Sequence, residues 1–187
     1  FIGVWWPGGE NDARPAGDGA TGYKTMNFNG VGQDYQAIQD ILTHVYDAGL
    51  SQAKERSQVG ENLYNRGVMN SFLMVEAIRT AQEMTGNANV TPADVRAGLE
   101  ALNITAERIA EAGLEGFMQP VQLSCDDHAG QGDVYVQQWN GETWEQVSDW
   151  FSPMVARVRP MLETAADAYT EANAPWPERE VACAVSG

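Results

Sequence analysis

ENLYNRGVMNSFLMVEAIRTAQEMTG, residues 61–86, predicts one long helix around which the rest of the chain is organised. Apolar side chains recur at spacings of three or four residues, as one helical face requires: Leu63, Tyr64, Val68, Phe72, Val75 and Ile78. Four more widen that face until the middle of the helix is apolar almost all round: Met69, Leu73, Met74 and Ala77. We therefore expect a helix buried on more than one side, ending in a left-handed cap at Gly86.

The N-terminus of this helix is polar, and it suggests binding. Tyr64, Asn65 and Arg66 lie in its first turns, where unpaired backbone N–H groups and the helix dipole favour an anion. A planar guanidinium suits a ligand carboxylate. The alternative for Arg66 is an ion pair with one of the many acidic residues of the chain. These three residues are candidate ligand-binding residues.

Composition bounds the class of protein. The 187 residues are 43% hydrophobic and 20% charged, which fits one globular domain or two lobes that share the chain. The net charge of −15 argues against nucleic acid or anionic lipid as a partner. Two cysteines, Cys125 and Cys183, permit one disulfide or two buried thiols. No apolar run approaches the roughly 20 residues that span a bilayer.

Periodicity predicts strands alternating with helices, followed by a late hairpin. Strands are expected at residues 1–6, 22–28 and 117–124, helices at 33–48, 91–102, 105–112 and 154–172, and a hairpin at 134–139 and 142–150. Residues 7–21 are expected to form a loop rich in Gly, Pro and Asp. Thr91, Pro92 and Asp94 make a strong helix start. The predicted fold class is α/β, with mainly parallel sheets flanked by helices plus the hairpin.

One short segment holds side chains that bind metals or act as nucleophiles: Cys125, Asp126, Asp127, His128 and Asp133. Their spacing matches no established metal-ligand frame, and the neighbouring glycines favour turns. A thiol beside an imidazole lacks an orienting third group here. The chain also has no phosphate-binding or nucleophile-elbow motif. We predict no metal, no cofactor and no catalytic residue.

Aromatic residues at the start of the chain are a second binding candidate. Trp5 and Trp6 end the first predicted strand, and Glu10 follows in the loop. Side chains alternate along a strand, so one tryptophan is expected to pack and the other to face the opposite side. In α/β sheets, ligands lie beyond the carboxyl ends of strands. Trp5, Trp6 and Glu10 are therefore candidate ligand-binding residues, whereas three tryptophans of the hairpin are expected to pack: Trp139, Trp144 and Trp150.

Several segments, taken in order, resemble the periplasmic solute-binding proteins of branched-chain amino acid ABC importers. They are FIGVWW, ENDARPAGDGATGY, LYNRGVMNSFLMVEAIRTAQ and SCDDHAGQGDVYVQQWNGETW. The likeness is nearest to a branch of that family with tryptophan-rich ends and an extended C-terminus. It covers nearly all of this chain but only the second half of a family member. Because the chain also opens directly on an apolar stretch without a signal peptide, we expect an N-terminal half to be absent.

The resemblance implies the type I periplasmic-binding-protein fold, in which two α/β lobes close on a small solute. It assigns residues 1–21 and 131–187 to the second lobe. Residues 22–130, with the central helix 62–85 and the last hinge crossing, go to the first lobe. Trp5 then corresponds to a position on the second-lobe wall, and Tyr64 with Asn65 to one on the first lobe. Relatives place an acidic residue near the first strand, where this chain has Trp5 and Trp6. Glu10 is the candidate substitute, and this departure favours an aromatic acid or amide over leucine.

The resemblance implies a non-enzymatic, periplasmic receptor that delivers amino acids or related small carboxylates to an ABC permease. An alternative is the ligand-sensing domain of an amide or amino-acid regulator. A hydrolase of α/β type is a third reading, but no nucleophile, base and oxyanion donors come together in the sequence. Without its N-terminal half, the chain would expose apolar helix faces. It is then expected to associate with that missing portion or with a second copy of itself.

Overall fold

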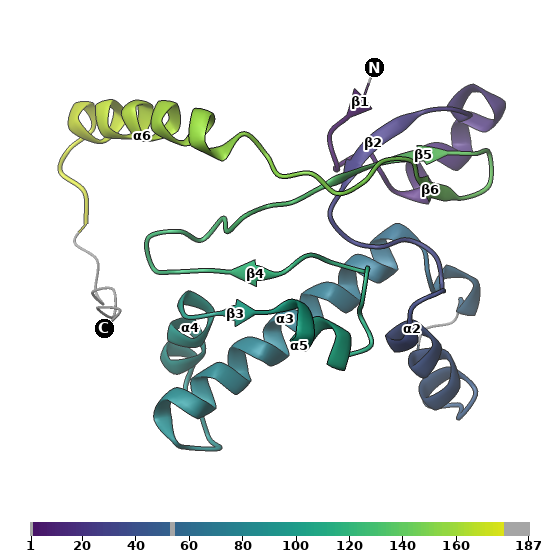
Figure 1. The fold of residues 1–187 in the computed structure, drawn as a ribbon, viewed down its shortest axis with the longest axis horizontal. Coiled ribbons are helices and arrows are strands. Elements are labelled where there is room, and N and C mark those ends of the chain that lie inside the picture. Colours follow the sequence, from purple (N-terminus) through teal and green to yellow (C-terminus); the bar gives the residue numbers. More distant parts are fainter. Residues whose placement is uncertain (1, 53–54, 178–187) are drawn as a thin grey trace.

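The computed structural model describes residues 2–52 and 55–177 and has a mixed α/β architecture (Figure 1). Its helices are α1 Glu10–Ala13, α2 Gln36–Ile41, α3 Asn62–Thr85, α4 Pro92–Glu100, α5 Ala106–Glu111 and α6 Val155–Ala172, with short turns η1 Arg14–Ala20, η2 Leu42–Tyr46 and η3 Arg56–Gln58. Its strands are β1 Ile2–Gly3, β2 Lys24–Asn27, β3 Asn103–Ile104, β4 Val121–Gln122, β5 Tyr135–Trp139 and β6 Trp144–Gln146.

A four-stranded sheet occupies one end of the molecule, in the order β1-β2-β5-β6. β1 and β2 are parallel, whereas β2 with β5 and β5 with β6 are antiparallel. β3 and β4 form a separate antiparallel pair. The mixed α/β class and the late hairpin are thus confirmed. The expectation of mainly parallel sheets is wrong for the described residues, because β5 returns from the distant end of the chain and runs against β2.

The central helix is confirmed over Asn62–Thr85, and Gly86 ends it at a φ of 65°. Ala77 and Ala81 are fully buried against α4, where a side chain at Gly98 would collide with the carbonyl of Ala77. Some large apolar side chains along the helix are nevertheless about half exposed: Leu63, Met74, Val75 and Met84. Met69 is buried in an apolar cluster with residues of α2 and α5, so the expected burial of the helix on more than one side is found in its middle.

The predicted start at Thr91 is confirmed as a capping box. The Thr91 hydroxyl accepts from the Asp94 amide at 3.3 Å, and the Asp94 carboxylate accepts from the Thr91 amide at 2.8 Å. α5 begins in a similar way, with the Thr105 hydroxyl accepting from the Arg108 amide. These caps satisfy N–H groups that no helix can bond internally.

Two apolar clusters hold the described residues together. The larger one joins α2, α3, the β3–β4 pair and α5: Ile38, Leu42, Val59, Met69, Leu102, Ile104, Ile109, Leu114, Phe117 and Met118. The smaller one lies at the sheet: Ala13, Ala20, Trp139 and Trp144. The prediction that the hairpin tryptophans pack is confirmed for Trp139 and Trp144, while the Trp150 ring lies edge-on to the Tyr135 ring.

Three predicted segments differ from the structure. The first strand covers only Ile2–Gly3, and it lies at the edge of the sheet, so Ile2 is exposed. The segment 7–21 is not a plain loop but contains α1 and η1, because Asp12 caps the Gly9 amide and starts a helical turn. The strand expected at 117–124 shortens to Val121–Gln122, since Phe117 belongs to the turn that follows α5.

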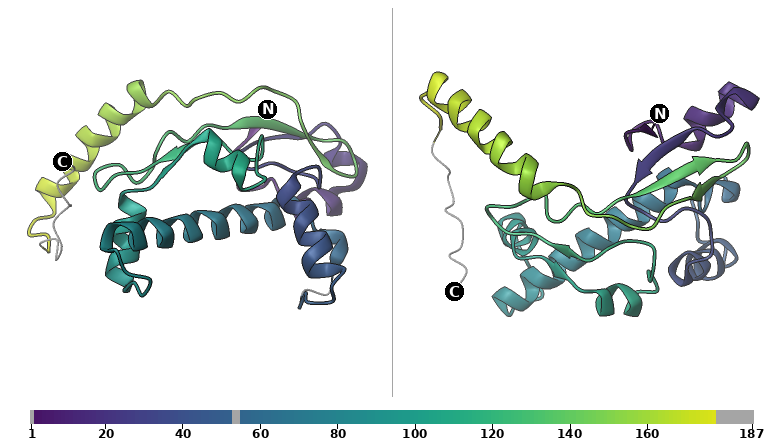
Figure 2. Two further views of the ribbon diagram at one scale, coloured as in Figure 1. Left: turned by 60° about the horizontal axis from the view of Figure 1, so that its bottom comes forward. Right: turned by 45° about the horizontal axis from the view of Figure 1, so that its top comes forward.

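α6 stands apart from the rest, at the end of an extended segment (Figures 1 and 2). It confirms the helix predicted at residues 154–172. None of its residues is buried, and apolar side chains along it are exposed, among them Val158, Met161 and Leu162. Its tie to the body is Arg159, which pairs with Asp127 at 2.6 Å.

Candidate functional site

A buried polar network lies where the sheet meets the N-terminus of α3. Residues on one face of β2 and β5 are buried, and the register places Asn27 opposite Tyr135 and Thr25 opposite Gln137. In an ordinary strand this inward face would be apolar. Asn62, the first residue of α3, is also fully buried against these strands.

Hydrogen bonds connect the members of this network. The Asn27 Nδ2 group lies within 3.1 Å of the Tyr135 hydroxyl, the Gln137 Oε1 atom and the Asn62 Oδ1 atom. The Tyr135 hydroxyl donates to the carbonyl of Asn29 at 2.7 Å. Burial raises the pKa of the Tyr135 hydroxyl above its ordinary value, so this group stays a donor at neutral pH. Fully bonded buried polar groups of this kind fix their own geometry.

Arg66 lies on the next turn of α3 and inserts between two aromatic rings. Its Cζ atom lies 4.9 Å from the centroid of the Trp5 ring and 4.7 Å from that of Phe28. Its Nε atom donates to Asn29 Oδ1 at 3.1 Å, and its Nη2 atom to Asn27 Oδ1 at 3.0 Å. Burial lowers the pKa of Arg66, but guanidinium groups remain charged in proteins. This site is therefore a half-buried cation with aromatic walls.

The Nη1 edge of this guanidinium is open in the sense that it has no hydrogen-bond partner in the described part of the chain. Among the described residues, none accepts a hydrogen bond from Arg66 Nη1, and no carboxylate lies within 4 Å of the group. Two N–H donors there are left for another partner. The sequence alternative, an ion pair of Arg66 with an acidic residue, is not found within these residues. A small anion is the chemical group that such an edge accepts best.

Trp5 and Trp6 lie in the bend after β1, so alternation along a strand does not place them, and their rings contact each other instead of facing opposite sides. The Trp5 ring is 38% exposed and contacts both the Arg66 guanidinium and the Phe28 ring edge-on at 5.5 Å. The Trp6 ring is 73% exposed and lies edge-on to Trp5 at 4.8 Å. Trp5 therefore belongs to the wall of the Arg66 site, and Trp6 forms its exposed rim.

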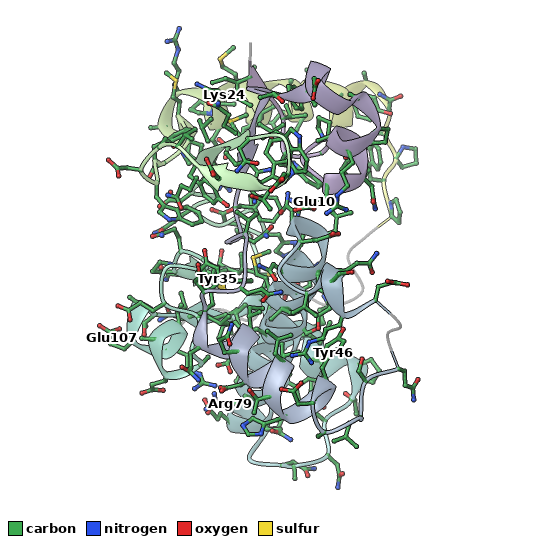
Figure 3. The ribbon with its side chains drawn as sticks, turned by 90° about the vertical axis from the view of Figure 1, so that its right-hand side faces the viewer. Glu10, Lys24, Tyr35, Tyr46, Arg79 and Glu107 are labelled. Carbon is green, nitrogen blue, oxygen red and sulfur yellow. The ribbon has the colours of Figure 1, made fainter. Side chains whose placement is uncertain are left out.

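Glu10 is buried at the start of α3, where it lines a cavity of about 420 Å³ together with Arg14 and Trp144. It lies where the sheet meets the helical part of the molecule (Figure 3), and both its carboxylate oxygens accept from the backbone N–H of Asn62, at 3.0 and 3.1 Å. Burial raises the pKa of this carboxyl, and the Asn62 hydrogen bonds lower it by less. Glu10 thus caps α3 and fixes the helix turn that carries Arg66.

Tyr64 and Asn65 point away from Arg66. Residues one or two apart on a helix do not share a face, and Tyr64 packs on the larger apolar cluster. Burial and a hydrogen bond with Tyr46 raise the pKa of Tyr64 to about 12. Asn65 is fully buried and donates to the carbonyls of Gly30 and Gly32 at 3.0 and 2.9 Å. The structure thus brings together Trp5, Trp6, Arg66 and the capping Glu10, but neither Tyr64 nor Asn65.

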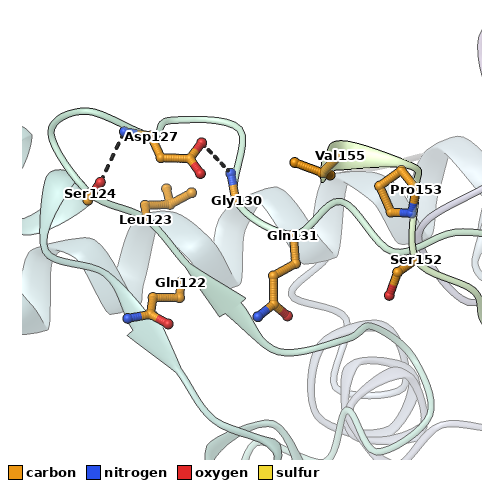
Figure 4. Close-up of a pocket in the computed structure, with 9 residues that line it drawn as sticks. All are labelled: Gln122, Leu123, Ser124, Asp127, Gly130, Gln131, Ser152, Pro153 and Val155. Atoms are coloured by element: carbon orange, nitrogen blue, oxygen red, sulfur yellow. Dashed lines mark hydrogen bonds between the residues drawn. The ribbon is translucent and has the colours of Figure 1, made fainter. Parts of the chain in front are cut away.

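A cavity of about 580 Å³ lies elsewhere, between the β4 end and the start of α6 (Figure 4). Its polar lining includes Gln122, Gln131 and Ser152. Asp127 holds its rim by accepting from the Gly130 amide at 3.3 Å. None of the predicted ligand-binding residues lines it. The cavity is open and no buried charged side chain among the described residues lines it, so it offers no group that would select a particular ligand.

The segment 125–133 is a turn within the described residues, as its glycines predicted. Asp127 accepts from the amides of Ala129 and Gly130, and no group of three metal-binding side chains occurs in the described part of the chain. Cys183 lies outside the described residues, so its bond with Cys125 stays a prediction.

Sequence reasoning missed the residues that hold the site: Asn27, Asn29, Asn62, Tyr135 and Gln137. One signal was available. The motifs NFNG at residues 27–30 and YVQQ at 135–138 place polar residues at strand positions whose alternation assigns them to the inner face. Such residues are expected to be bonded to one another. No local sequence pattern indicated which residue each of them would bond to.

Comparison with protein-family models finds no match, and comparison with curated proteins finds none. Two solved structures are similar. A crystal structure described as an ABC transporter permease from the Pseudomonas fluorescens group is 35% identical, with a TM-score of 0.88 over 96% of this chain and 43% of its own. A branched-chain amino acid ABC transporter from Thermus thermophilus with bound valine is 20% identical, with a TM-score of 0.64 over 84% of this chain and 40% of its own.

These neighbours are ABC transporter components and not enzymes. The chain therefore has an ABC-transporter-related fold and resembles a fragment of a periplasmic binding protein. It spans about two fifths of the length of each neighbour. In the part of the chain that the structure describes, no helix is long and apolar enough to cross a membrane.

Proposed function

We propose that this chain is the C-terminal part of an extracytoplasmic solute-binding component of an ABC importer. It binds amino acids or related small carboxylates, aromatic ones included, and passes them to a membrane permease. The observation that carries the proposal is the open edge of Arg66 between Trp5 and Phe28. Of the neighbours, the Thermus thermophilus structure has valine bound, a ligand that carries a carboxylate.

The chemistry of the site selects a carboxylate of limited size. A guanidinium presents N–H donors in a plane, and a carboxylate accepts them with charge-assisted bonds. The Trp5 and Phe28 rings restrict water around the cation, which strengthens each bond. Trp6 at the rim offers an exposed aromatic surface on which an aromatic acid can stack. An aromatic carboxylate therefore gains more from this wall than leucine does.

Lobe closure is the proposed mode of action. The two apolar clusters are candidates for the cores of two lobes, and the polar network between them is the candidate hinge. The sequence expectation puts residues 1–21 and 131–187 in the second lobe and 22–130 in the first, and we move residues 22–27 to the second lobe. β2 pairs with β1 and β5, so the first crossing would come after Asn27. Closure would seal the ligand between lobes and present the loaded form to the permease.

Titration calorimetry on the full-length protein that carries this chain tests the proposal. Leucine, phenylalanine, benzoate and benzamide are titrated into wild type, Arg66→Met and Arg96→Met. Arg96 is the matched control, because it makes only an exposed i,i+4 pair with Glu100. We expect a carboxylate to bind, and Arg66→Met to weaken it by about 100-fold, with Arg96→Met unchanged. Equal binding by wild type and Arg66→Met, or turnover of a ligand, would contradict the proposal.

A further inference from the structure

Arg66 is held by neutral oxygens only, which sets it apart from most arginines of this acidic chain. Its hydrogen-bond acceptors are the side-chain oxygens of Asn27, Asn29 and Asn62, at 3.0, 3.1 and 3.5 Å. Six of the other arginines have a carboxylate within 4 Å: Arg14, Arg56, Arg79, Arg96, Arg108 and Arg159. The sequence has 26 acidic residues, so a carboxylate partner would be the ordinary choice for an arginine. That this half-buried arginine has amide partners instead calls for a physical reason.

The network fixes which way these amides point. The Asn27 Nδ2 group faces three acceptors in the network besides the carbonyl of Asn29, so its oxygen must face Arg66. The Asn29 Nδ2 group donates to Asn62 Oδ1 at 3.0 Å and to the carbonyl of Gly30 at 3.2 Å, which turns its oxygen the same way. Both asparagines are fully buried, so neither amide can flip without losing several bonds.

An amide oxygen and a carboxylate oxygen can accept the same hydrogen bond from a guanidinium. Only the carboxylate brings a negative charge. A carboxylate at either position would neutralise Arg66 and repel an incoming anion. An amide positions the group and leaves its charge for a ligand. Glu10, whose charge acts on Arg66, uses both its oxygens on the Asn62 backbone amide, so it does not compete for the open edge.

We propose that Asn27 and Asn29 determine specificity for carboxylates by positioning Arg66 without neutralising it. The inference rests on the proposed function, since it names the residues that make the same site selective. Both residues act through Arg66 and are positioning residues. An aspartate at either position would keep the shape of the side chain and convert the site from one that prefers an anion to one that prefers a neutral amide.

The first test compares benzoate with benzamide on the full-length protein by calorimetry, in wild type, Asn27→Asp and Asn29→Asp. We expect each substitution to weaken benzoate by at least about tenfold and to change benzamide by less than about threefold. A structural defect alone would weaken both ligands in parallel. Asn87→Asp is the matched control, because it adds the same charge in an exposed turn beyond the far end of α3, about 30 Å from Arg66 at 1.5 Å per residue.

A second readout needs no ligand and no folded aspartate variant. Iodide and neutral acrylamide quench tryptophan fluorescence, and an available charge on Arg66 concentrates iodide at Trp5. The ratio of iodide to acrylamide quenching should therefore fall in Arg66→Met, and in each aspartate variant that folds, but not in Asn87→Asp.

The outcomes distinguish the proposed function from the positioning role of Asn27 and Asn29. A lower quenching ratio in Arg66→Met, with benzoate lost selectively in the aspartate variants, supports both. A lower ratio in a protein that binds no carboxylate overturns the proposed function and still supports an unpaired Arg66. An unchanged ratio in Arg66→Met, or benzoate binding that survives both aspartate substitutions, overturns the positioning role of Asn27 and Asn29.

Discussion

Arg66 lies on α3 and Arg108 of α5 pairs with the same helix, yet their surroundings are opposite. Arg108 donates from Nη2 and Nε to the two carboxylate oxygens of Glu76, at 2.7 and 3.0 Å. Arg66 donates to amide oxygens and lies against Trp5 and Phe28. One cation is neutralised and ties α5 to the middle of the helix. The other keeps its charge at the helix start, where the sheet meets the helices.

This difference separates a stabilising contact from a binding contact. A charge paired bidentately has little left for a ligand, and its loss harms the fold. A charge held by dipoles contributes less to the fold and more to recognition. The same helix thus carries both kinds of site about three turns apart. Variants on each side of the comparison should change different measurements.

The largest effect is expected at Glu76. Its side chain is 9% exposed and pairs with Arg79 and Arg108. Glu76→Gln should lower the free energy of unfolding by about 2–3 kcal/mol, somewhat less than for a fully buried pair because the Arg108 side chain is 32% exposed. Urea unfolding of the full-length protein measures this change. Carboxylate affinity should stay as in wild type, and a selective loss of affinity would erase the distinction between the two arginines.

Trp5 tests the other side of the comparison. Trp5→Ala removes one wall of the Arg66 site and should weaken a bound carboxylate by about 1–2 kcal/mol, the range for a partly desolvated cation–π wall. Trp6→Ala is the matched control, since Trp6 is more exposed and lies edge-on to Trp5, while the rings against the Arg66 guanidinium are those of Trp5 and Phe28. Calorimetry should show a smaller loss for Trp6→Ala. Equal losses would mean that the exposed rim, and not the wall, binds the ligand.

The carboxyls of Glu76 and Glu10 should contribute to stability with opposite dependence on pH. Hydrogen bonds from Arg108 lower the pKa of Glu76, so its contribution to stability is present above the unfolded pKa and is lost as pH falls through the folded value. Burial raises the pKa of Glu10, so its contribution is present below the unfolded pKa and is lost as pH rises through the folded value.

Urea midpoints from acid to neutral pH, in wild type, Glu76→Gln and Glu10→Gln, measure both trends. The advantage of wild type over Glu76→Gln should shrink toward acid pH. The urea midpoint of wild type, taken relative to that of Glu10→Gln, should fall as pH rises. Parallel curves for the two variants would mean that neither environment acts as described.

The sequence predicted the elements whose signals are local. Helix 62–85 and the capping box at Thr91 follow from periodicity and from residues within one turn of each other. The hairpin follows from Asn140-Gly141. Arg66 and Trp5 were recognised by residue type and position, and the structure brings them into contact.

The residues that position Arg66 could not be predicted from the sequence, because their places depend on contacts between segments far apart in the chain. Asn27 meets Gln137 only once β2 and β5 pair, 110 residues apart. Glu10 was placed in a loop from its Gly-rich surroundings, and its cap on α3 requires a contact 52 residues away. Tyr64 was assigned to binding because it lies with Asn65 and Arg66 in the first turns of the helix, although helical geometry turns it to the core.

The smallest effect is expected at Arg56, an arginine paired with a carboxylate but exposed. Arg56 lies 2.6 Å from Asp47, yet the two side chains are 51% and 59% exposed. Water screens such a pair, and Arg56→Ala should change the free energy of unfolding by less than about 1 kcal/mol. Urea unfolding in low and high salt checks this. A loss as large as that of Glu76→Gln would show that pairing with a carboxylate, and not burial of the pair, decides how an arginine stabilises this fold.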